Sequence, residues 1–520
     1  MRPIDYFDNG HDQDPDAVCL VQDDTGREYS YAEVRELTLR TGNGLLSAGF
    51  ERGARGAVLS INDPIAFTCA LSFLRAGLAW VPINPGNALE ENIHALQDFD
   101  CQVLFYHSVF EPTIPAIKEQ VPDIKLYVCI DGPGADAPAF DDWVQGFAAD
   151  EIEIEDDQDD LATLQPTGGT TGRSKGARHT NRSISALIMA HLAVTSCDDQ
   201  PPVYLAAAPM THAGGYICFT ILARGGTVIV QAKIEPGPFL AAIPKYGVTT
   251  LFLPPTVIYM FLSLPNIREV DFSSLRHFIY GAAPMSPDKL IEAMEVFGPV
   301  MTQMFGQSEC AFPITYLSPA DHAKAVASNN LKPLSSCGKI APIARVAIMD
   351  DDGNRLPAGE IGEIVVHTPM VMQGYHKNPE LTAEVSAHGW HHTGDIGYLD
   401  ENNFLYIVDR KKDMIITGGF NVFSTEVEKA VMAHPAIQDC AVIGVPDDKW
   451  GEAVKAVVEL RDGNTATEAE IIALCKDAIG SVKAPKSVEF TAELPRSSNG
   501  KVLKRAVREQ FWADAERQVH

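Results

Sequence analysis

Short apolar runs alternate with helical patterns through about the first 400 residues, and this alternation constrains the fold more than any other feature. Buried strands are expected at residues 57–61, 103–106, 126–130, 203–208, 227–230 and 250–253. Helices are expected at residues 64–75, ending near Gly77, and at 258–264. Strands that alternate with helices form parallel sheets covered by helices. The sequence therefore predicts an α/β fold with parallel or mixed sheets.

The pattern changes after the charged segment at residues 409–413. Strands are expected at residues 440–445 and 453–460, and two Thr-x-x-Glu segments have the spacing of capping boxes that open helices, Thr425 to Glu428 and Thr467 to Glu470. Gly480 is expected to end the second helix. We therefore expect a large N-terminal domain of several subdomains at residues 1–409, a hinge at 410–413 and a small α+β C-terminal domain at 414–520.

Residues 151–160 carry seven acidic side chains in ten positions. Like charges repel one another and stay in water, so this segment is expected to be a solvated connector. It leads into a short apolar run at residues 161–164, which is expected to be a strand.

Acidic side chains outnumber basic ones by 69 to 41, which gives a net charge of −28. This charge disfavours nucleic acid and anionic membranes as partners. No apolar run reaches the ~18 residues of a membrane-spanning helix, and the first ten residues do not resemble a signal peptide. The ten cysteines include no Cys-x-x-Cys pair. We expect a cytoplasmic protein without an integral membrane segment, and a homo-oligomer is possible.

A glycine-rich segment at residues 167–176 contains three threonines and one lysine. Glycines let backbone N–H groups converge on an anion, and hydroxyl groups and a lysine add donors and charge. The spacing is not that of a Walker loop, because Arg173 stands five residues after Gly168 and Gly176 follows Lys175. A flexible linker is the simpler alternative, but linkers rarely combine threonines with a lysine. The segment therefore predicts a polyphosphate site.

Further motifs follow in a fixed order: Pro209-Met-Thr-His-Ala-Gly-Gly215, Tyr280-Gly-Ala-Ala-Pro284, Met304-Phe-Gly-Gln-Ser-Glu309, Thr393-Gly-Asp395, Asp409-Arg-Lys-Lys-Asp413, Thr417-Gly-Gly-Phe-Asn421 and Pro495-Arg-Ser-Ser-Asn-Gly-Lys501. Together with the glycine-rich segment they closely resemble the adenylate-forming superfamily, of the acyl- and aryl-CoA synthetase type. The resemblance covers residues from about 15 to 510. It implies that a carboxylate attacks the α-phosphorus of ATP, giving acyl-AMP and pyrophosphate, and that a thiol then displaces AMP.

The resemblance also implies which residues bind ATP. The phosphates would lie against Thr167, Gly168, Gly169, Thr170, Thr171, Gly172 and Lys175. The adenine would lie against Phe305 and the segment Gly281, Ala282 and Ala283, with Gly306 and Ser308 close by. The ribose hydroxyls would bind Asp395, a charged acceptor, and Arg410.

The implied catalytic residues are Lys501, Glu309, His212 and Thr171. Glu309 and Thr170 would hold Mg²⁺, which prefers oxygen ligands. Lys501 would bridge the carboxylate and the α-phosphate, where the barrier is repulsion between anions. His212 would lie near the acid. Amino-acid-activating relatives carry an aspartate close to this point, and its absence here predicts an acid without an α-amino group.

The resemblance implies a CoA site as well. Gly418 and Gly419 would line the pantetheine tunnel, Trp450 would stack on the CoA adenine, and Lys483 and Lys486 would meet its phosphates. Lys412 would be the hinge position about which the C-terminal domain moves between the two steps.

Three functions stay open at this stage. The first is a CoA ligase for an apolar fatty or aryl acid, because the candidate pocket positions Met210, His212, Gly215, Tyr216, Pro254, Tyr280 and Phe312 are mostly apolar. The second is an adenylating enzyme that loads a separate carrier protein. The third is a catalytically dead nucleotide-binding homologue, although Lys175, Glu309, Asp395 and Lys501 are all retained.

Overall fold

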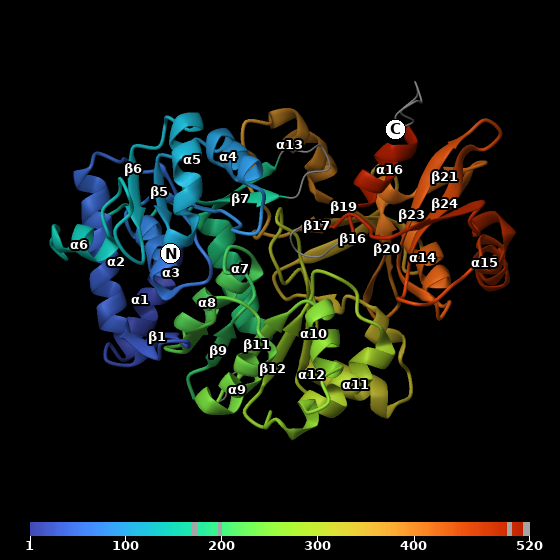
Figure 1. Cartoon of the computed structure of the whole chain (residues 1–520), viewed down its shortest axis with the longest axis horizontal. Helices are drawn as coiled ribbons and strands as arrows, with labels where there is room; N and C mark the ends of the chain where they lie inside the picture. Colours follow the sequence, from blue (N-terminus) through green and yellow to red (C-terminus); the bar gives the residue numbers. More distant parts are fainter. Residues whose placement is uncertain (168–173, 196–199, 497–501, 513–520) are drawn as a thin grey trace. The chain divides into compact units, whose positions relative to one another are not determined.

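The computed structural model describes residues 1–167, 174–195, 200–496 and 502–512 (Figure 1). The chain divides into two compact units. The first contains Met1–Val346, Val366–His391 and Asn403–Leu405, and the second contains Ala347–Val365, His392–Asn402 and Tyr406–His520. The expected α/β class with mixed sheets is confirmed. This division does not identify a moving segment, so the hinge at residues 410–413 stays a prediction.

One sheet of the first unit has seven strands in the order β18-β8-β7-β4-β3-β5-β6. The inner strands are parallel, and β8 returns antiparallel to β7. The strands are β3 (Arg55–Leu59), β4 (Ala79–Pro82), β5 (Val103–Tyr106), β6 (Leu126–Cys129), β7 (Leu161–Thr167), β8 (Lys175–Thr180) and β18 (Gly374–Tyr375). The helices of this part of the chain are α1 (Pro3–Gln13), α2 (Tyr31–Ser47), α3 (Pro64–Arg75), α4 (Leu89–Asp98), α5 (Ile114–Gln120) and α6 (Phe140–Gln145) (Figure 1).

The other sheet of this unit has nine strands in the order β15-β14-β13-β12-β11-β9-β10-β1-β2. The strands from β13 to β1 in this order are parallel, and the edge strands are antiparallel. The strands are β1 (Val18–Gln22), β2 (Arg27–Ser30), β9 (Val203–Ala206), β10 (Thr227–Val230), β11 (Thr250–Leu253), β12 (His277–Tyr280), β13 (Met301–Phe305), β14 (Thr315–Leu317) and β15 (Lys339–Ile340).

Helices α7 (Asn181–Val194), α8 (Ala213–Leu222), α9 (Pro236–Tyr246), α10 (Pro255–Leu262), α11 (Pro287–Phe297), α12 (Pro319–Ala327) and α13 (Pro379–Val385) complete the first unit. The candidate motifs at residues 209–215, 281–284 and 306–309 follow the carboxyl ends of β9, β12 and β13. Open α/β sheets bind ligands at this end of their strands. The fold therefore places these motifs where a ligand site is expected.

The second unit contains two sheets, one with the order β16-β17-β19-β20 and one with the order β22-β21-β24-β23, in which β25 also pairs with β24. The strands are β16 (Arg345–Met349), β17 (Gly362–His367), β19 (His391–Leu399), β20 (Leu405–Arg410), β21 (Ile415–Thr417), β22 (Phe420–Val422), β23 (Ile437–Asp447), β24 (Gly451–Leu460) and β25 (Ser487–Thr491). The helices are α14 (Ser424–Met432), α15 (Glu468–Lys483) and α16 (Lys504–Trp512).

Strand β23 is covered on both faces. Cys440 and Val442 pack in one core with residues of α14 and α15. Ala441 and Ile443 pack in another core with Val507 of α16. Successive residues of a strand point to opposite faces, so the two cores follow from alternate positions of one apolar run.

The capping box at Thr467 is confirmed, because Thr467 Oγ1 accepts the Glu470 N–H and the Glu470 carboxylate accepts the Thr467 N–H. The capping box at Thr425 is wrong. Helix α14 begins at Ser424, and the Glu428 carboxylate pairs with Lys504 instead. Gly480 has a φ of 82° inside α15 and interrupts the helix near its end.

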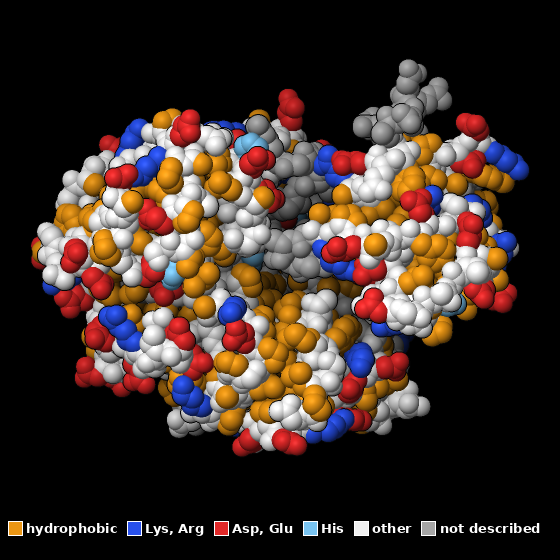
Figure 2. All heavy atoms as spheres, in the orientation of Figure 1, with side chains coloured by type: hydrophobic (Ala, Val, Ile, Leu, Met, Phe, Trp, Pro, Cys, Tyr) orange, Lys and Arg blue, Asp and Glu red, His pale blue; other side chains and the backbone are white. Residues whose placement is uncertain are grey.

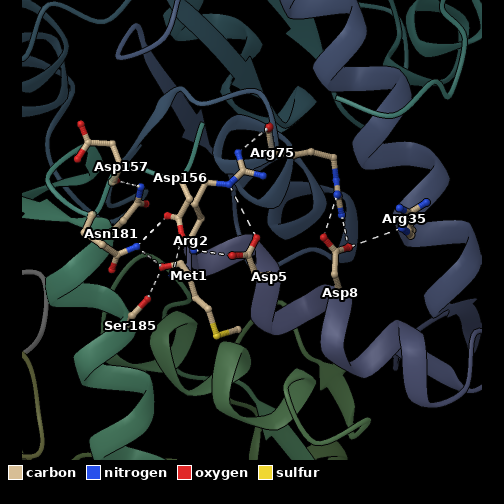
Figure 3. A network of polar contacts seen from close by, with 11 residues as sticks. Met1, Arg2, Asp5, Asp8, Arg35, Arg75, Asp156, Asp157, Asn181 and Ser185 are labelled. Atoms are coloured by element: carbon tan, nitrogen blue, oxygen red, sulfur yellow. Dashed lines mark hydrogen bonds and ion pairs between the residues drawn. The ribbon is translucent and has the colours of Figure 1, made fainter. Parts of the chain in front are cut away.

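The acidic segment at residues 151–160 is largely exposed, as expected. Polar contacts also join it to other parts of the first unit (Figure 3). The Met1 amino group lies 2.9 Å from Asp156 Oδ2. Asn181 Nδ2 donates to the Asp157 carbonyl at 2.8 Å. The segment therefore has fixed partners although most of its carboxylates face water.

Figure 2 shows carboxylate side chains spread over the visible face instead of gathered in one patch. Among the described residues no helix is both long and apolar enough to cross a membrane. No disulfide links the described cysteines, and all of them except Cys337 are buried.

Candidate active site

The glycine-rich segment joins the two strands of a hairpin. Thr167 at the end of β7 pairs with Lys175 at the start of β8. The expected phosphate-binding residues Gly168, Gly169, Thr170, Thr171 and Gly172 lie outside the described residues. The structure therefore fixes both ends of this segment, with a lysine at one end and a buried threonine at the other.

Tyr375 connects Lys175 with Glu309. The Lys175 ammonium lies 5.5 Å from the centre of the Tyr375 ring, and the Tyr375 hydroxyl donates to Glu309 Oε1 at 2.8 Å. Burial and the Glu309 carboxylate raise the pKa of the Tyr375 hydroxyl, which therefore stays a donor. Two residues that the sequence places 134 positions apart (309 minus 175) thus meet through one side chain.

Two backbone carbonyls of the turn that carries Glu309 contact other parts of the fold. His179 Nε2 lies 2.7 Å from the Ser308 carbonyl, and the Met372 N–H donates to the Glu309 carbonyl at 2.8 Å. The carboxylate is an oxygen ligand of the kind that Mg²⁺ prefers. Among the described residues no three His, Cys, Asp or Glu side chains could hold a metal together. A Mg²⁺ ion at Glu309 would take further ligands beyond these side chains, such as the expected Thr170 hydroxyl, phosphates and water, which is common for this ion.

His212 precedes α8 and is held by polar side chains of β7. Its Nδ1 lies 3.3 Å from Gln165 Nε2. The Tyr216 hydroxyl donates to Gln165 Oε1 at 3.1 Å and lies 3.3 Å from Thr163 Oγ1. His212 Nε2 is buried without a hydrogen-bond partner among the described residues. Burial lowers the pKa of His212, so the ring is a neutral imidazole with one free nitrogen.

The expected adenine segment after β12 passes close to β13. A Cβ at Gly281 would lie 2.4 Å from the Met304 carbonyl, and one at Gly306 would lie 2.5 Å from the Phe312 N atom. Ala282 has a φ of 64°, which is rare for alanine. Strained backbone of this kind clusters at ligand sites. Phe305 ends β13 and is partly exposed.

Phe312 lies between two further rings. It stacks on Phe252 of β11 at a centroid distance of 6.3 Å, and the centroid of the His191 ring lies 5.9 Å away with the two ring planes at 77°. Neither ring nitrogen of the buried His191 has a hydrogen-bond partner among the described residues. The surroundings of Phe312 are thus aromatic, with one neutral imidazole whose pKa burial lowers to about 3.

In the second unit Asp395 and Arg410 are neighbours. Arg410 Nε lies 3.4 Å from Asp395 Oδ1, and the Asp395 side chain is only 6% exposed. Thr393 Oγ1 accepts the Asp395 N–H at 3.1 Å and donates to the Ile364 carbonyl at 2.7 Å. The structure thus brings together the two residues that were expected to bind the ribose.

The expected CoA residues lie on the small sheet of the same unit. The Gly418 N–H donates to the Trp450 carbonyl at 2.8 Å, and a Cβ at Gly418 would lie 2.5 Å from the Trp450 ring. Lys483 already pairs with both Glu426 oxygens at 2.7 Å. Lys486 Nζ donates to the Ser481 carbonyl at 2.6 Å. Both lysines therefore have protein partners that a phosphate would have to replace.

Gly419, next to this contact, has a φ of 81°. Lys412 lies in a short 3-10 turn, Lys411–Asp413, directly after β20. Lys501 lies outside the described residues.

The sequence profile of the AMP-binding enzyme family matches residues 7–376, and the profile of the AMP-binding enzyme C-terminal domain matches residues 426–501. The chain belongs to this family. It is 37% identical to the medium/long-chain-fatty-acid–CoA ligase FadD8 of Mycobacterium tuberculosis, over 91% of this chain and 84% of that protein. It is 35% identical to a feruloyl-CoA synthase of an Amycolatopsis species, over 94% of both chains.

Other members use different acceptors. The fatty acid–[acyl-carrier-protein] ligase ScoC of Streptomyces coeruleorubidus is 30% identical, over 95% of this chain and 94% of that protein. The solved structure of the amide bond synthetase McbA of Marinactinospora thermotolerans is 31% identical, covers 98% of this chain and all of that chain, and superposes with a TM-score of 0.87.

Sequence reasoning missed several residues of this AMP-binding enzyme. Tyr375, Gln165 and His179 contact expected site residues but stand in segments that carry no motif. Gln165 offered one signal, since it is a polar residue in an apolar strand directly before the glycine-rich segment. Tyr375 and His179 offered none, because their partners are distant in sequence.

Proposed function

We propose that this chain is an ATP-dependent carboxylic acid–CoA ligase. The acid attacks the α-phosphorus of ATP and pyrophosphate leaves. The CoA thiol then attacks the acyl carbon, and AMP leaves. The observation that supports the proposal is the contact of Lys175 and Glu309 with one tyrosine, since Lys175 is the cation expected to bind phosphate and Glu309 the carboxylate expected to bind Mg²⁺.

The proposed roles follow from the charges that must be held. Lys175 and the glycine-rich segment bind the β- and γ-phosphates, whose charge grows as pyrophosphate leaves. Glu309 binds Mg²⁺, with Thr170 as a second oxygen ligand. Asp395 and Arg410 orient the ribose. Lys501 reduces the repulsion between the acid and the α-phosphate.

The acid is proposed to be an apolar fatty or aryl acid without an α-amino group. Phe252 and Phe312 stack on each other, with Phe252 on β11, the strand that pairs with β12. His212 is neutral, and residues 209–215 contain no carboxylate to pair an ammonium group. The named substrates of FadD8 and the feruloyl-CoA synthase are of these two kinds. The proposed compartment is the cytoplasm, because ten scattered cysteines without a Cys-x-x-Cys pair suit a reducing environment.

A second candidate is an adenylating enzyme that loads a carrier protein, because the similarity to ScoC covers nearly the whole chain. The two candidates share the first step and differ only in the thiol that accepts the acyl group.

The test is incubation with ATP, Mg²⁺, CoA and a panel of fatty and aryl acids. The proposal expects AMP, pyrophosphate and a CoA thioester with at least one acid. ADP and phosphate as products would refute the adenylation chemistry. Acid-dependent pyrophosphate exchange without a CoA thioester would favour the carrier-protein reading, and no exchange with any acid would indicate a dead homologue.

A further inference from the structure

The expected catalytic lysine, Lys501, stands one residue before the base of a hairpin. Arg496 and Val502 form an antiparallel bridge. The Leu503 N–H donates to the Pro495 carbonyl at 2.8 Å. The described backbone on the two sides of residues 497–501 is therefore joined, and the contacts that hold this base can be followed in the described residues.

The residue at the start of this base, Arg496, forms ion pairs with the neighbouring strands β23 and β24 of the small sheet. Arg496 Nη2 lies 2.8 Å from Asp439 Oδ2 and 3.3 Å from Glu459 Oε2. Asp439 belongs to β23 and Glu459 to β24. The Glu459 carboxylate also accepts the Leu494 N–H at 3.2 Å.

The residues after this base, which follow Val502, are held by Lys504 at the start of α16. Its Nζ lies 2.8 Å from Glu428 Oε1 and donates to Ser424 Oγ at 2.7 Å. The Lys504 and Glu428 side chains are each only 18% exposed. The Val442 N–H donates to the same Glu428 oxygen at 2.9 Å, so this carboxylate has a fixed position.

Ser424 in turn contacts Asp409, the residue directly before the expected hinge. The Ser424 N–H donates to Asp409 Oδ2, and the Ser424 hydroxyl donates to the two Asp409 oxygens at 2.9 and 3.0 Å. Ser424 and Asp409 are 0% and 2% exposed. One cation thus joins α14, α16 and the end of β20 in a buried set of charged and polar groups. Buried ion pairs of this kind are better known for fixing one arrangement than for adding stability.

We infer that Lys504 is a positioning residue for adenylation, which holds the base of the Lys501 segment to Glu428, Ser424 and Asp409. The inference rests on the proposed function, because Lys501 acts only if the chain forms an acyl-adenylate. Lys504 itself is not expected to touch ATP or the acid. Its effect comes from placement, and a misplacement of about 1 Å costs on the order of 100-fold in rate.

Kinetics of the two half-reactions test this role. Lys504→Gln should lower acid-dependent pyrophosphate exchange by about 10- to 100-fold, mainly in kcat, with little change in thioester formation from supplied acyl-AMP. Lys504→Arg should restore most of the exchange, because a guanidinium can reach both Glu428 and Ser424. Arg505→Gln is the matched control, since Arg505 is the next residue and its ion pair among the described residues is an exposed one with Glu509.

Equal losses in both half-reactions, or no loss in either, would overturn the inference. If Lys504→Gln does not fold, Glu428→Gln removes the same ion pair while its amide oxygen can still accept the Val442 N–H. That variant should lower exchange in the same direction, and a melting temperature near that of the wild type separates misplacement from unfolding.

Amide hydrogen exchange gives a readout that needs no activity. Peptides containing Leu503 should exchange faster in Lys504→Gln than in the wild type and in Arg505→Gln. Wild-type protein that forms no adenylate with any acid would refute the proposed function. Faster exchange at Leu503 would then still establish that Lys504 holds the base, and unchanged exchange would refute this.

Discussion

At the scale of single residues, Tyr375 explains how the expected Mg²⁺ ligand keeps its orientation. Its hydroxyl donates to Glu309 and its ring lies beside Lys175. A carboxylate that accepts a hydrogen bond from a fixed donor loses fewer rotamers when a cation binds. The side chain that fixes a metal ligand is often needed nearly as much as the ligand.

The contribution of the hydrogen bond between Tyr375 and Glu309 can be measured by the Mg²⁺ dependence of pyrophosphate exchange. Tyr375→Phe removes only the hydroxyl and should raise the Mg²⁺ concentration for half-maximal exchange by about tenfold. Glu309→Gln removes the charge and should have the larger effect. Tyr246→Phe, on a tyrosine at the end of α9 that is not an expected site residue, is the control. Unchanged Mg²⁺ dependence in both variants would remove Glu309 from this role.

The expected role of Lys501 gives a prediction that needs no structural detail around this residue. Lys501→Ala should lower adenylation by about 10²–10³-fold, as expected when one preorganised donor is removed from a developing charge. Thioester formation from supplied acyl-AMP should stay close to the wild-type rate. Rapid-quench assays of the two half-reactions check this. Equal losses in both steps would contradict a role that is confined to adenylation.

At the scale of elements, the sequence predicted helix ends that are set by residues close to them in the chain. Helix α3 spans Pro64–Arg75 as expected, because Pro64 opens it and the Asp63 carboxylate accepts two N–H groups of its first turn. The start of α14 was not predictable in this way. The Ser424 N–H is capped by Asp409, which lies 15 residues upstream and reaches it only through the tertiary fold.

The same distinction applies to the candidate site, where motifs identified residues but not their distant contacts. Motifs singled out Lys175, Glu309, Asp395 and Arg410 as candidates, because phosphate and ribose binding need particular residue types at particular turns. They could not show that Lys483 is already paired with Glu426, since that contact joins residues 57 positions apart. Partners of this kind depend on packing, which a single sequence does not display.

The turn between β21 and β22 gives a prediction for the second step. Gly418 has a φ of 57°, and a Cβ there would meet the Trp450 ring at 2.5 Å. Gly418→Ala should therefore displace Trp450 and raise the KM for CoA, with adenylation unchanged. Gly463→Ala is a matched control, because Gly463 has a φ of 73° and open space around its Cβ position. An equal effect of both substitutions would assign the loss to backbone strain alone.

At the scale of the whole molecule, buried histidines make stability depend on pH. Burial, with His277 and Arg224 nearby, lowers the pKa of His191 from 6.5 to about 3. The unfolded chain therefore binds a proton between these values that the folded chain does not. Stability should fall as the pH falls below about 6.5, and His191 alone should account for about 2 kcal/mol at pH 5.

Melting temperatures at pH 5 and pH 7.5 test this. The difference between the two should be smaller in His191→Leu than in the wild type, because leucine takes up no proton in the unfolded chain. His94→Leu, at a partly exposed histidine, should leave the difference as it is in the wild type. An unchanged difference in His191→Leu would show that His191 takes up its proton in the folded protein.

In the proposed reaction one chain presents Lys501 in the first step and the glycines expected to bind CoA in the second, and the expected pivot is Lys412. Domain rotations of this kind are absorbed by φ and ψ changes at a few residues. Proline fixes φ near −65°, so Lys412→Pro should slow mainly the thioester step. Lys412→Ala removes the side chain and keeps the backbone free, and it should behave like the wild type. If both variants slow the same step equally, the lysine side chain is the cause and not the pivot. If neither changes either step, the rotation occurs elsewhere in the chain.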